Sequence, residues 1–153
     1  MVVSFFGHAE LCNSAELEPK LLSLLRTELE DEEYDLYFGG YGAFDALAHK
    51  CCRKLCAENK GKKMRFFYIT PYLSDEHLRR CVTEGNMDYD EIIYPSIEKV
   101  PLRFAISARN KWIVEKSDLV ISFVSKSYGG AYSAVKYAMR KGVRIINLGD
   151  FVV

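Results

Sequence analysis

Apolar positions along the chain form two kinds of pattern. Short continuous apolar runs are typical of strands buried on both faces, whereas apolar residues repeated every three or four positions are typical of helices. The continuous runs predict strands at 2–6, 35–38, 64–70, 91–94, 118–124 and 144–148. The helical spacing predicts helices from Asn13 or Ser14 to about Glu30 and at 44–59, 75–84, 105–116 and 130–140. Because strands and helices alternate, the pattern predicts an α/β fold, Rossmann-like and doubly wound, with a mainly parallel sheet and helices on both faces.

The pattern contains no break that would separate two domains. We find no linker, internal repeat or low-complexity segment, and 153 residues suffice for one domain with a sizeable core. The sequence therefore predicts a single domain over 1–153. Hydrophobic residues make up 49% and charged residues 27% of the chain, which is the balance of a globular domain rather than of a disordered one.

The sequence argues against a membrane or secreted setting. No apolar run approaches the roughly 20 residues that a membrane-spanning helix needs. The segment 1–6 lacks the basic flank and cleavage site of a signal peptide and is predicted to be the first strand. The five cysteines are an odd number without the spacing of a disulfide framework, so we expect reduced thiols and a cytoplasmic protein.

One group of potential metal ligands occurs on a predicted helix. His49, Cys52 and Cys56 lie at helical spacing, as zinc ligands do. A second ligand pair is missing, and this helix face is apolar, so buried core is the favoured interpretation. We expect no metal and no cofactor.

Charge is balanced over the chain. Lys plus Arg and Asp plus Glu each number 21. A balanced chain has no global basic field to attract DNA or RNA, which argues against nucleic acid as the partner. The balanced total charge is still compatible with a small local basic patch.

Two glycine turns are the clearest chemical signal in the sequence. They are Phe38-Gly39-Gly40-Tyr41-Gly42-Ala43-Phe44-Asp45 and Ser127-Tyr128-Gly129-Gly130-Ala131-Tyr132-Ser133. Each follows a predicted strand and opens a predicted helix. Glycine there lets the backbone approach an anion, and the helix N-terminus offers N–H groups and a positive dipole end. The alternative for each is an ordinary tight strand-to-helix connection.

The two turns predict different ligand contacts. In the first turn, we expect Gly39, Gly40 and Gly42 to allow close approach of a ligand. In the second turn, backbone N–H groups and hydroxyls suit phosphate oxygens, and the expected ligands are Ser127, Gly129, Gly130 and Ser133.

Two charged residues accompany the turns. Asp45 begins the helix after the first turn, where it could bind a ribose hydroxyl or act as a general acid/base. Alternatively, it caps the turn or complements the helix dipole. Arg109 leads toward the second turn and would point to the carboxyl ends of the strands, where ligands bind in such sheets, and Asn110 beside it is a further candidate ligand. The alternative is a surface arginine paired with an acid such as Glu115.

Three further candidates lie at the same predicted edge of the sheet. Gly7 and His8 end the first strand, and His8 could bind phosphate or act as a base, or be an ordinary turn histidine. Tyr72 follows the third strand and could stack on a base or simply pack.

The stretch from Arg109 to Ser133 resembles the SLOG superfamily, which joins DprA/Smf proteins, LOG-type "lysine decarboxylase-like" proteins and YpsA-like proteins. In LOG enzymes an arginine lies at the start of a helix. A strand that begins with an aspartate follows this helix, and a Gly-Gly loop follows the strand. Arg109 and Asp118 match that arginine and aspartate at the same separation, and Gly129-Gly130 match the paired glycines. Phe38-Gly39-Gly40-Tyr41-Gly42 resembles the earlier glycine turn of the family, so the resemblance covers essentially the whole chain.

The likeness is closest to the YpsA-like branch. Gly42-Ala43-Phe44-Asp45-Ala46-Leu47-Ala48 resembles its Gly-Phe-Asp-x-Leu-Ala turn, and Arg109-Asn110-Lys111-Trp112-Ile113-Val114 resembles its Arg-Asn-x-x-Met-Val helix. Residues 129–138 resemble its last glycine turn and helix. The resemblance implies a Rossmann-like pocket for a nucleotide-type molecule, and we expect a homodimer or a higher homo-oligomer.

One position departs from the LOG pattern. LOG-type phosphoribohydrolases cleave the base–ribose bond of nucleoside monophosphates with the arginine and with a glutamate at the end of the Gly-Gly motif. Lys136 falls near the position of that glutamate here, and a cation cannot stabilise an oxocarbenium-like centre as a carboxylate does.

The sequence therefore favours binding over catalysis. We expect binding of a nucleotide or nucleotide-derived ligand, such as a nucleoside monophosphate or an ADP-ribose-like signal. One alternative is an N-glycosidic hydrolase with Asp45 and Arg109 as catalytic residues. The other is a DprA-like module that binds single-stranded DNA.

Overall fold

The computed structural model describes the chain except for residues 32, 75, 77–78, 80–88 and 151–153. The short helix expected at 75–84 falls mainly on these positions and lies outside the described residues.

The described strands form one six-stranded sheet in the order β4-β3-β2-β1-β5-β6. All of the neighbouring strands pair in parallel. The strands are β1 (Val2–Gly7), β2 (Glu33–Phe38), β3 (Lys63–Ile69), β4 (Glu91–Ile93), β5 (Leu119–Phe123) and β6 (Arg144–Asn147). This arrangement confirms the predicted doubly wound α/β fold, because the chain builds the sheet outward from β1 in both directions.

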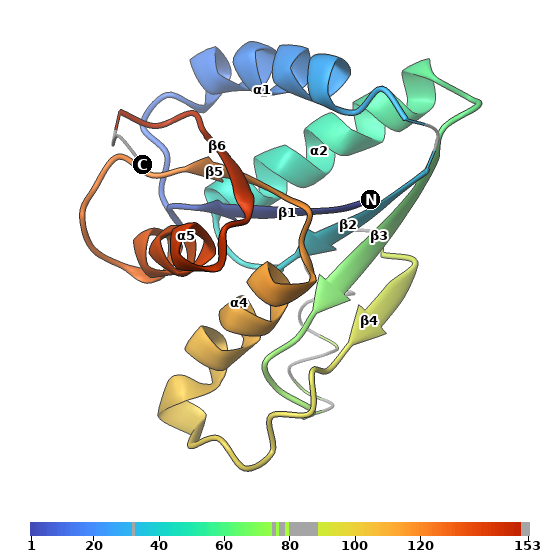
Figure 1. Cartoon of the computed structure of the whole chain (residues 1–153). Coiled ribbons are helices and arrows are strands. Elements are labelled where there is room, and N and C mark those ends of the chain that lie inside the picture. Colours follow the sequence, from blue (N-terminus) through green and yellow to red (C-terminus); the bar gives the residue numbers. More distant parts are fainter. Residues whose placement is uncertain (32, 75, 77–78, 80–88, 151–153) are drawn as a thin grey trace.

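Helices cover both faces of the sheet (Figure 1). Helices α1 (Ser14–Glu28) and α2 (Ala43–Glu58) lie on one face, and α4 (Ala105–Lys116) and α5 (Gly130–Lys141) lie on the other. A 3₁₀ turn, η2 (Leu102–Phe104), leads directly into α4. Each pair of helices packs closely together as well as on the sheet.

The alternation of side chains along β1 separates two cores. Val3 and Phe5 point to the α1–α2 side, where they join the larger hydrophobic cluster. Phe6 points to the opposite side and packs in the smaller cluster beneath α4 and α5. Because successive strand residues face opposite sides, a central strand must be apolar on both faces, as the continuous apolar runs predicted.

The predicted element bounds agree with the structure to within about two residues. The first helix ends at Glu28, and β2 begins at Glu33, slightly before the predicted start. At the start of α1 the side chain of Asn13 forms no capping bond, and the backbone oxygen of Asn13 accepts the N–H groups of Glu16 and Leu17. Gly142 ends α5 in the left-handed conformation, at φ 73°, as expected of a C-terminal glycine.

Within the described ranges, no helix combines the length and apolar character needed to cross a bilayer.

Candidate functional site

A hollow of about 460 Å³ lies at the carboxyl ends of the central strands, at the switch point where the strand order reverses. Strand β1 pairs with β2 on one side and with β5 on the other, so the loops that leave β1 and β5 diverge to opposite faces. The hollow is lined by Phe5, Phe6, Gly7, His8, Ala9, Glu10, Gly39, Tyr41, Asp45, Ile106, Arg109, Asn110, Lys126, Tyr128, Gly129, Gly130 and Ala131. This is the position at which open α/β sheets bind ligands.

The volume of a hollow does not by itself identify the candidate site, because a larger hollow exists elsewhere. A hollow of about 580 Å³ lies near the opposite edge of the sheet and includes Met1 and Arg65. Its lining carries charges of both signs, two of which form the Arg65–Asp35 ion pair. We place the candidate site at the switch point because backbone N–H groups, a histidine and an arginine converge there.

The first glycine turn is closed by bonds within the protein. The N–H groups of Gly39 and Gly40 donate to Oδ1 and Oδ2 of Asp45, each at 3.1 Å. The N–H of Ala43, the first residue of α2, donates to the carbonyl oxygen of Ala9 at 2.8 Å. The backbone donors of this turn that would approach an anion are thus largely used by the fold.

Close packing fixes the glycine positions in the first turn. Gly42 has φ +97°, and a Cβ there would lie 2.9 Å from Cα of Ala9. Gly40 has φ +73°, and a Cβ there would meet the ring of Tyr68 at 2.0 Å. Glycine at these positions is therefore required by the protein's own packing and backbone conformation.

Arg109 is buried and bonds to the same turn. Its Nη1 donates to the carbonyl oxygens of Gly39 and Ile69, both at 2.9 Å, and its Nε donates to Oδ1 of Asn110 at 2.9 Å. The side chain is only 6% exposed, which excludes the alternative of a surface arginine. Arg109 therefore joins α4 to the carboxyl ends of β2 and β3 at the edge of the hollow.

Asp45 is a buried carboxyl group, 7% exposed, in the lining of the hollow. Burial raises the pKa of Asp45 to about 7, against the opposing effects of the Gly39 N–H, the Arg109 guanidinium and the Gly40 N–H. The carboxyl group thus titrates near neutrality, which suits a general acid/base. Both of its oxygens also accept backbone hydrogen bonds, so the capping role expected as one alternative is observed.

The second glycine turn is open. Gly129 precedes α5 with φ +96°, and no atom lies within 4 Å of a Cβ built on Gly129 or Gly130. Among the described residues, the N–H groups of Gly130 and Ala131 have no hydrogen-bond partner in the protein. These donors lie at the N-terminus of a helix of 12 residues, so their dipoles and that of the helix favour an anion.

His8 connects the two sides of the switch point. Its Nε2 accepts the N–H of Ser125 at 3.0 Å, so the ring is neutral and carries its proton on Nδ1. Burial and the nearby charge of Lys126 lower the pKa of His8. A neutral imidazole beside the hollow can still donate from Nδ1 to a ligand.

Some of the remaining predicted ligand residues line a hollow, and others do not. Asn110 lines the hollow, and Ser133 lines a neighbouring one between α4 and α5. Tyr72 and Ser127 line neither. Tyr72 instead closes a small turn in which its N–H donates to Oγ1 of Thr70 at 3.2 Å.

Asp118, which supports the resemblance, and Lys136, which departs from it, both lie outside the hollow. Oδ2 of Asp118 accepts the N–H of Val2 at 2.7 Å, so Asp118 joins the starts of β1 and β5 at the opposite edge of the sheet. Lys136 is exposed on α5 and lines neither hollow.

Sequence reasoning missed several residues that shape the hollow. Tyr41 is 81% exposed and lines it from the first turn. Lys126 and Ile106 line it from the other side. The signal available for Tyr41 was its place inside a glycine turn, where a large aromatic side chain has no core to enter.

Comparison with known proteins defines the fold. No protein-family model matches the chain, and no curated protein matches it in sequence. Among solved structures, the X-ray structure of the protein TM1055 superposes with a TM-score of 0.60 at 18% identity, covering 94% of this chain and 71% of that one.

Two DNA processing proteins share the same architecture. DprA from Streptococcus pneumoniae gives a TM-score of 0.60 at 19% identity over 95% of this chain. DprA from Helicobacter pylori, in a structure that addresses its single-stranded DNA binding mode, gives 0.61 at 15% identity over 96% of this chain. The chain spans 49% and 64% of these two structures. The similarities establish a Rossmann-like α/β fold shared with these proteins, and they leave the expectation against nucleic acid without support.

Proposed function

We propose that the protein binds a nucleotide or nucleotide-derived ligand in the switch-point hollow, with a phosphate group at the N-terminus of α5. The observation that carries this proposal is the open second turn, where the N–H groups of Gly130 and Ala131 lack partners in the described chain. An anion bound there would accept these donors and interact favourably with the helix dipole. The exposed amine of Lys126, from the same loop, adds positive charge to the lining.

Aromatic side chains at the hollow suit a nucleobase. Tyr41 and Tyr128 are 81% and 67% exposed, and each extends from one of the two glycine turns into the lining. A base stacked on such a ring gains roughly 1–3 kcal/mol without demanding a particular base. Asp45 and Arg109 then form the polar wall of the hollow, where we propose that they meet the ribose or a phosphate oxygen.

The test adds negative charge to the open turn. Gly130→Asp places a carboxylate where the phosphate would bind, and open space around a Cβ at Gly130 means that the fold accommodates it. We expect the affinity for adenosine monophosphate or ADP-ribose, measured by calorimetry, to fall at least about tenfold, since like charges repel and the donors are occupied. Thermal stability should be unchanged or slightly higher, because an acid suits a helix N-terminus.

Gly61→Asp is the matched control. Gly61 is also exposed, with open space around a Cβ, but it lies between α2 and β3, away from the hollow. Its substitution should leave nucleotide affinity unchanged. Equal binding by wild type and Gly130→Asp would reject the site, and release of free adenine by the wild type would instead indicate the hydrolase.

Single-stranded DNA binding is the second candidate function. It is favoured by the structural similarity to the Helicobacter pylori protein. Such binding would weaken steeply with salt, because a strand displaces counterions as its phosphates are neutralised. A nucleotide held at one phosphate would lose much less affinity, so a salt series separates the two candidates.

We also propose that the protein is related to the YpsA-like branch and that it works as a cytoplasmic homo-oligomer. The Gly42–Ala48 and Arg109–Val114 segments support the branch, since both form the turns and helices on which its motifs depend. Sedimentation at micromolar concentration would test the oligomer, and a monomer would contradict it.

A further inference from the structure

A second hollow, of about 450 Å³, lies between α4 and α5. It is lined by Arg103, Ile106, Ser107, Asn110, Lys111, Gly130, Ser133, Ala134, Tyr137 and Arg140. This lining contains three cationic side chains and several hydroxyl or amide groups but no carboxylate. The chain as a whole carries no net charge, so the positive charge here is a local concentration.

The cations of the second hollow have no ion-pair partner in the part of the chain that the structure describes. Within the described residues, Arg103, Lys111 and Arg140 form no salt bridge. Cations that gather between helices without carboxylates repel one another and are balanced only by solvent ions or by a bound anion.

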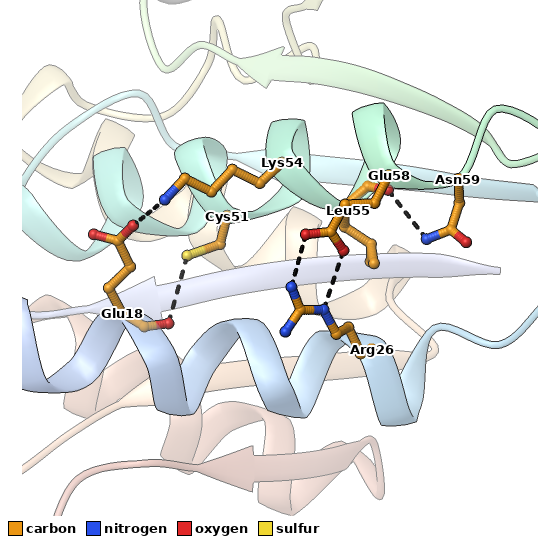
Figure 2. A network of polar contacts seen from close by, with 7 residues as sticks. All are labelled: Glu18, Arg26, Cys51, Lys54, Leu55, Glu58 and Asn59. Carbon is orange, nitrogen blue, oxygen red and sulfur yellow. Dashed lines mark hydrogen bonds and ion pairs between the residues drawn. The ribbon is translucent and has the colours of Figure 1, made fainter.

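The opposite face of the protein shows the contrast. Between α1 and α2, Glu18 pairs with Lys54, and Arg26 forms a two-pronged bond to Glu58 (Figure 2). Glu18 also pairs with Lys50. Those cations are neutralised by partners on the facing helix. Helices α4 and α5 also pack as a pair on the sheet. Cations without ion-pair partners among the described residues therefore distinguish the second hollow from the α1–α2 pair.

Two of the cationic side chains of the second hollow lie close to the ring of Tyr137. Nζ of Lys111 lies 5.6 Å from the ring centroid, and Cζ of Arg140 lies 5.5 Å from it. The Tyr137 hydroxyl donates to Glu115, which occupies that carboxylate. Because an aromatic face attracts a cation without cancelling its charge, both side chains keep their full charge available to an anion.

The second hollow adjoins the first at Ile106, Asn110 and Gly130, which line both. We infer that the ligand carries a second phosphate-type group, which lies in the α4–α5 hollow against Lys111 and Arg140 while the first binds the N-terminus of α5. This inference rests on the proposed nucleotide site and extends it. The ligand class is a nucleotide-derived molecule with two successive phosphates, either a free dinucleotide or part of a strand.

The experiment compares ligands that differ by one nucleotide unit, and therefore by one phosphate. Calorimetry at low salt with adenosine monophosphate and with the 5′-phosphorylated adenosine dinucleotide should show the dinucleotide binding about tenfold more tightly. Arg140→Gln and Lys111→Gln should each remove most of this advantage, roughly three- to tenfold, and leave adenosine monophosphate affinity within about twofold. Lys20→Gln, which removes an exposed cation of α1, is the matched control and should change neither affinity.

Each outcome is decisive for one of the two claims. If both ligands bind equally, or if the dinucleotide advantage survives in Arg140→Gln, the second phosphate position is wrong while the nucleotide site stands. If adenosine monophosphate does not bind but inorganic pyrophosphate does, with loss in Arg140→Gln, the anion hollow stands and the nucleotide site is wrong. A twelve-residue oligodeoxyadenylate that binds more tightly than the dinucleotide would identify a strand as the source, and equal affinity would identify a free dinucleotide.

Discussion

The two glycine turns have nearly the same backbone dihedral angles at Gly42 and Gly129, but they differ in whether their N–H donors are available to a ligand. Gly42 and Gly129 each precede a helix, with φ, ψ of 97°, 165° and 96°, 176°. Around Gly42, the chain that leaves β1 accepts the first N–H of α2, and a Cβ would collide with Ala9. Around Gly129, space is open, and the N–H groups of Gly130 and Ala131 have no protein partner within the described residues.

This difference separates two uses of one local conformation. In the first turn, glycine permits close packing of the backbone on itself, and Asp45 takes the place that an external anion would occupy. In the second turn, glycine leaves the helix N-terminus uncovered. A glycine motif therefore predicts backbone geometry, whereas the surrounding chain decides whether that geometry is offered to a ligand.

Removing Arg109 should break the closed turn most strongly. Arg109→Met leaves the carbonyl oxygens of Gly39 and Ile69 without this donor and leaves Asp45 without its neighbouring positive charge. We expect the free energy of unfolding, measured by urea denaturation, to fall by roughly 3–5 kcal/mol, because two carbonyl oxygens lose this donor at a cost of about 1–3 kcal/mol each. Arg109→Lys should fall between, because it keeps the charge but not the forked geometry. A change below about 1 kcal/mol in Arg109→Met would contradict the role of Arg109 in the turn.

Alanine at the two equivalent glycines isolates packing from backbone strain. Gly42→Ala and Gly129→Ala both place a side chain at strongly positive φ, which costs of order 1–3 kcal/mol. Only Gly42→Ala also meets backbone, at 2.9 Å from Cα of Ala9. We therefore expect Gly42→Ala to lose about 1–3 kcal/mol more than Gly129→Ala in thermal or urea unfolding. Equal losses would mean that the first turn is no more tightly packed than the second.

The two turns should respond to pH with opposite signs, and these effects are the smallest. The pKa of Asp45 is about 7 in the folded protein and lies above its unfolded value. Its contribution to stability is therefore present at low pH and lost as pH rises from about 4 through 7. The pKa of His8, next to the second turn, is lowered, so its contribution is present above about 6.5 and lost as pH falls through the lowered pKa.

Variant proteins resolve the two contributions. Relative to the wild type, Asp45→Asn should remove the loss of stability between about pH 4 and 7. Imidazole NMR should show His8 titrating below pH 6.5, together with a shift of the Ser125 amide as its bond to Nε2 breaks. A normal His8 titration, or an Asp45→Asn profile parallel to the wild type, would remove the proposed pH contrast.

The sequence predicted the fold well because the relevant signals are local. Continuous apolar runs mark strands that are covered on both faces, and the alternation of elements implies parallel crossovers. The convergence of His8, Arg109 and Gly129 on one hollow was also predictable, since the ends of neighbouring parallel strands lie at one edge of a sheet.

The sequence left open whether the N–H donors of the first turn are occupied, because capping by Asp45 was one of two alternatives. That the N–H groups of Gly39 and Gly40 would bond to Asp45, six and five residues further on, depends on how the turn folds back on α2. Likewise, the cations of the α4–α5 hollow are scattered along the sequence, and their missing partners are evident only when the two helices are placed side by side. Both properties belong to tertiary contacts rather than to motifs.

The central position of β1 has a consequence for the order of assembly. Strand β1 is made before the other strands, and its neighbour β2 follows closely in sequence. Its other neighbour, β5, begins just after Asp118, which lies 116 residues from Val2. We therefore expect strands β1 to β4, with α1 and α2, to assemble first, because contacts that are near in sequence close faster than distant ones. During that interval the outer edge of β1 is an unpaired template for other chains. Docking of β5 removes this aggregation hazard, and the same event creates the ligand hollow.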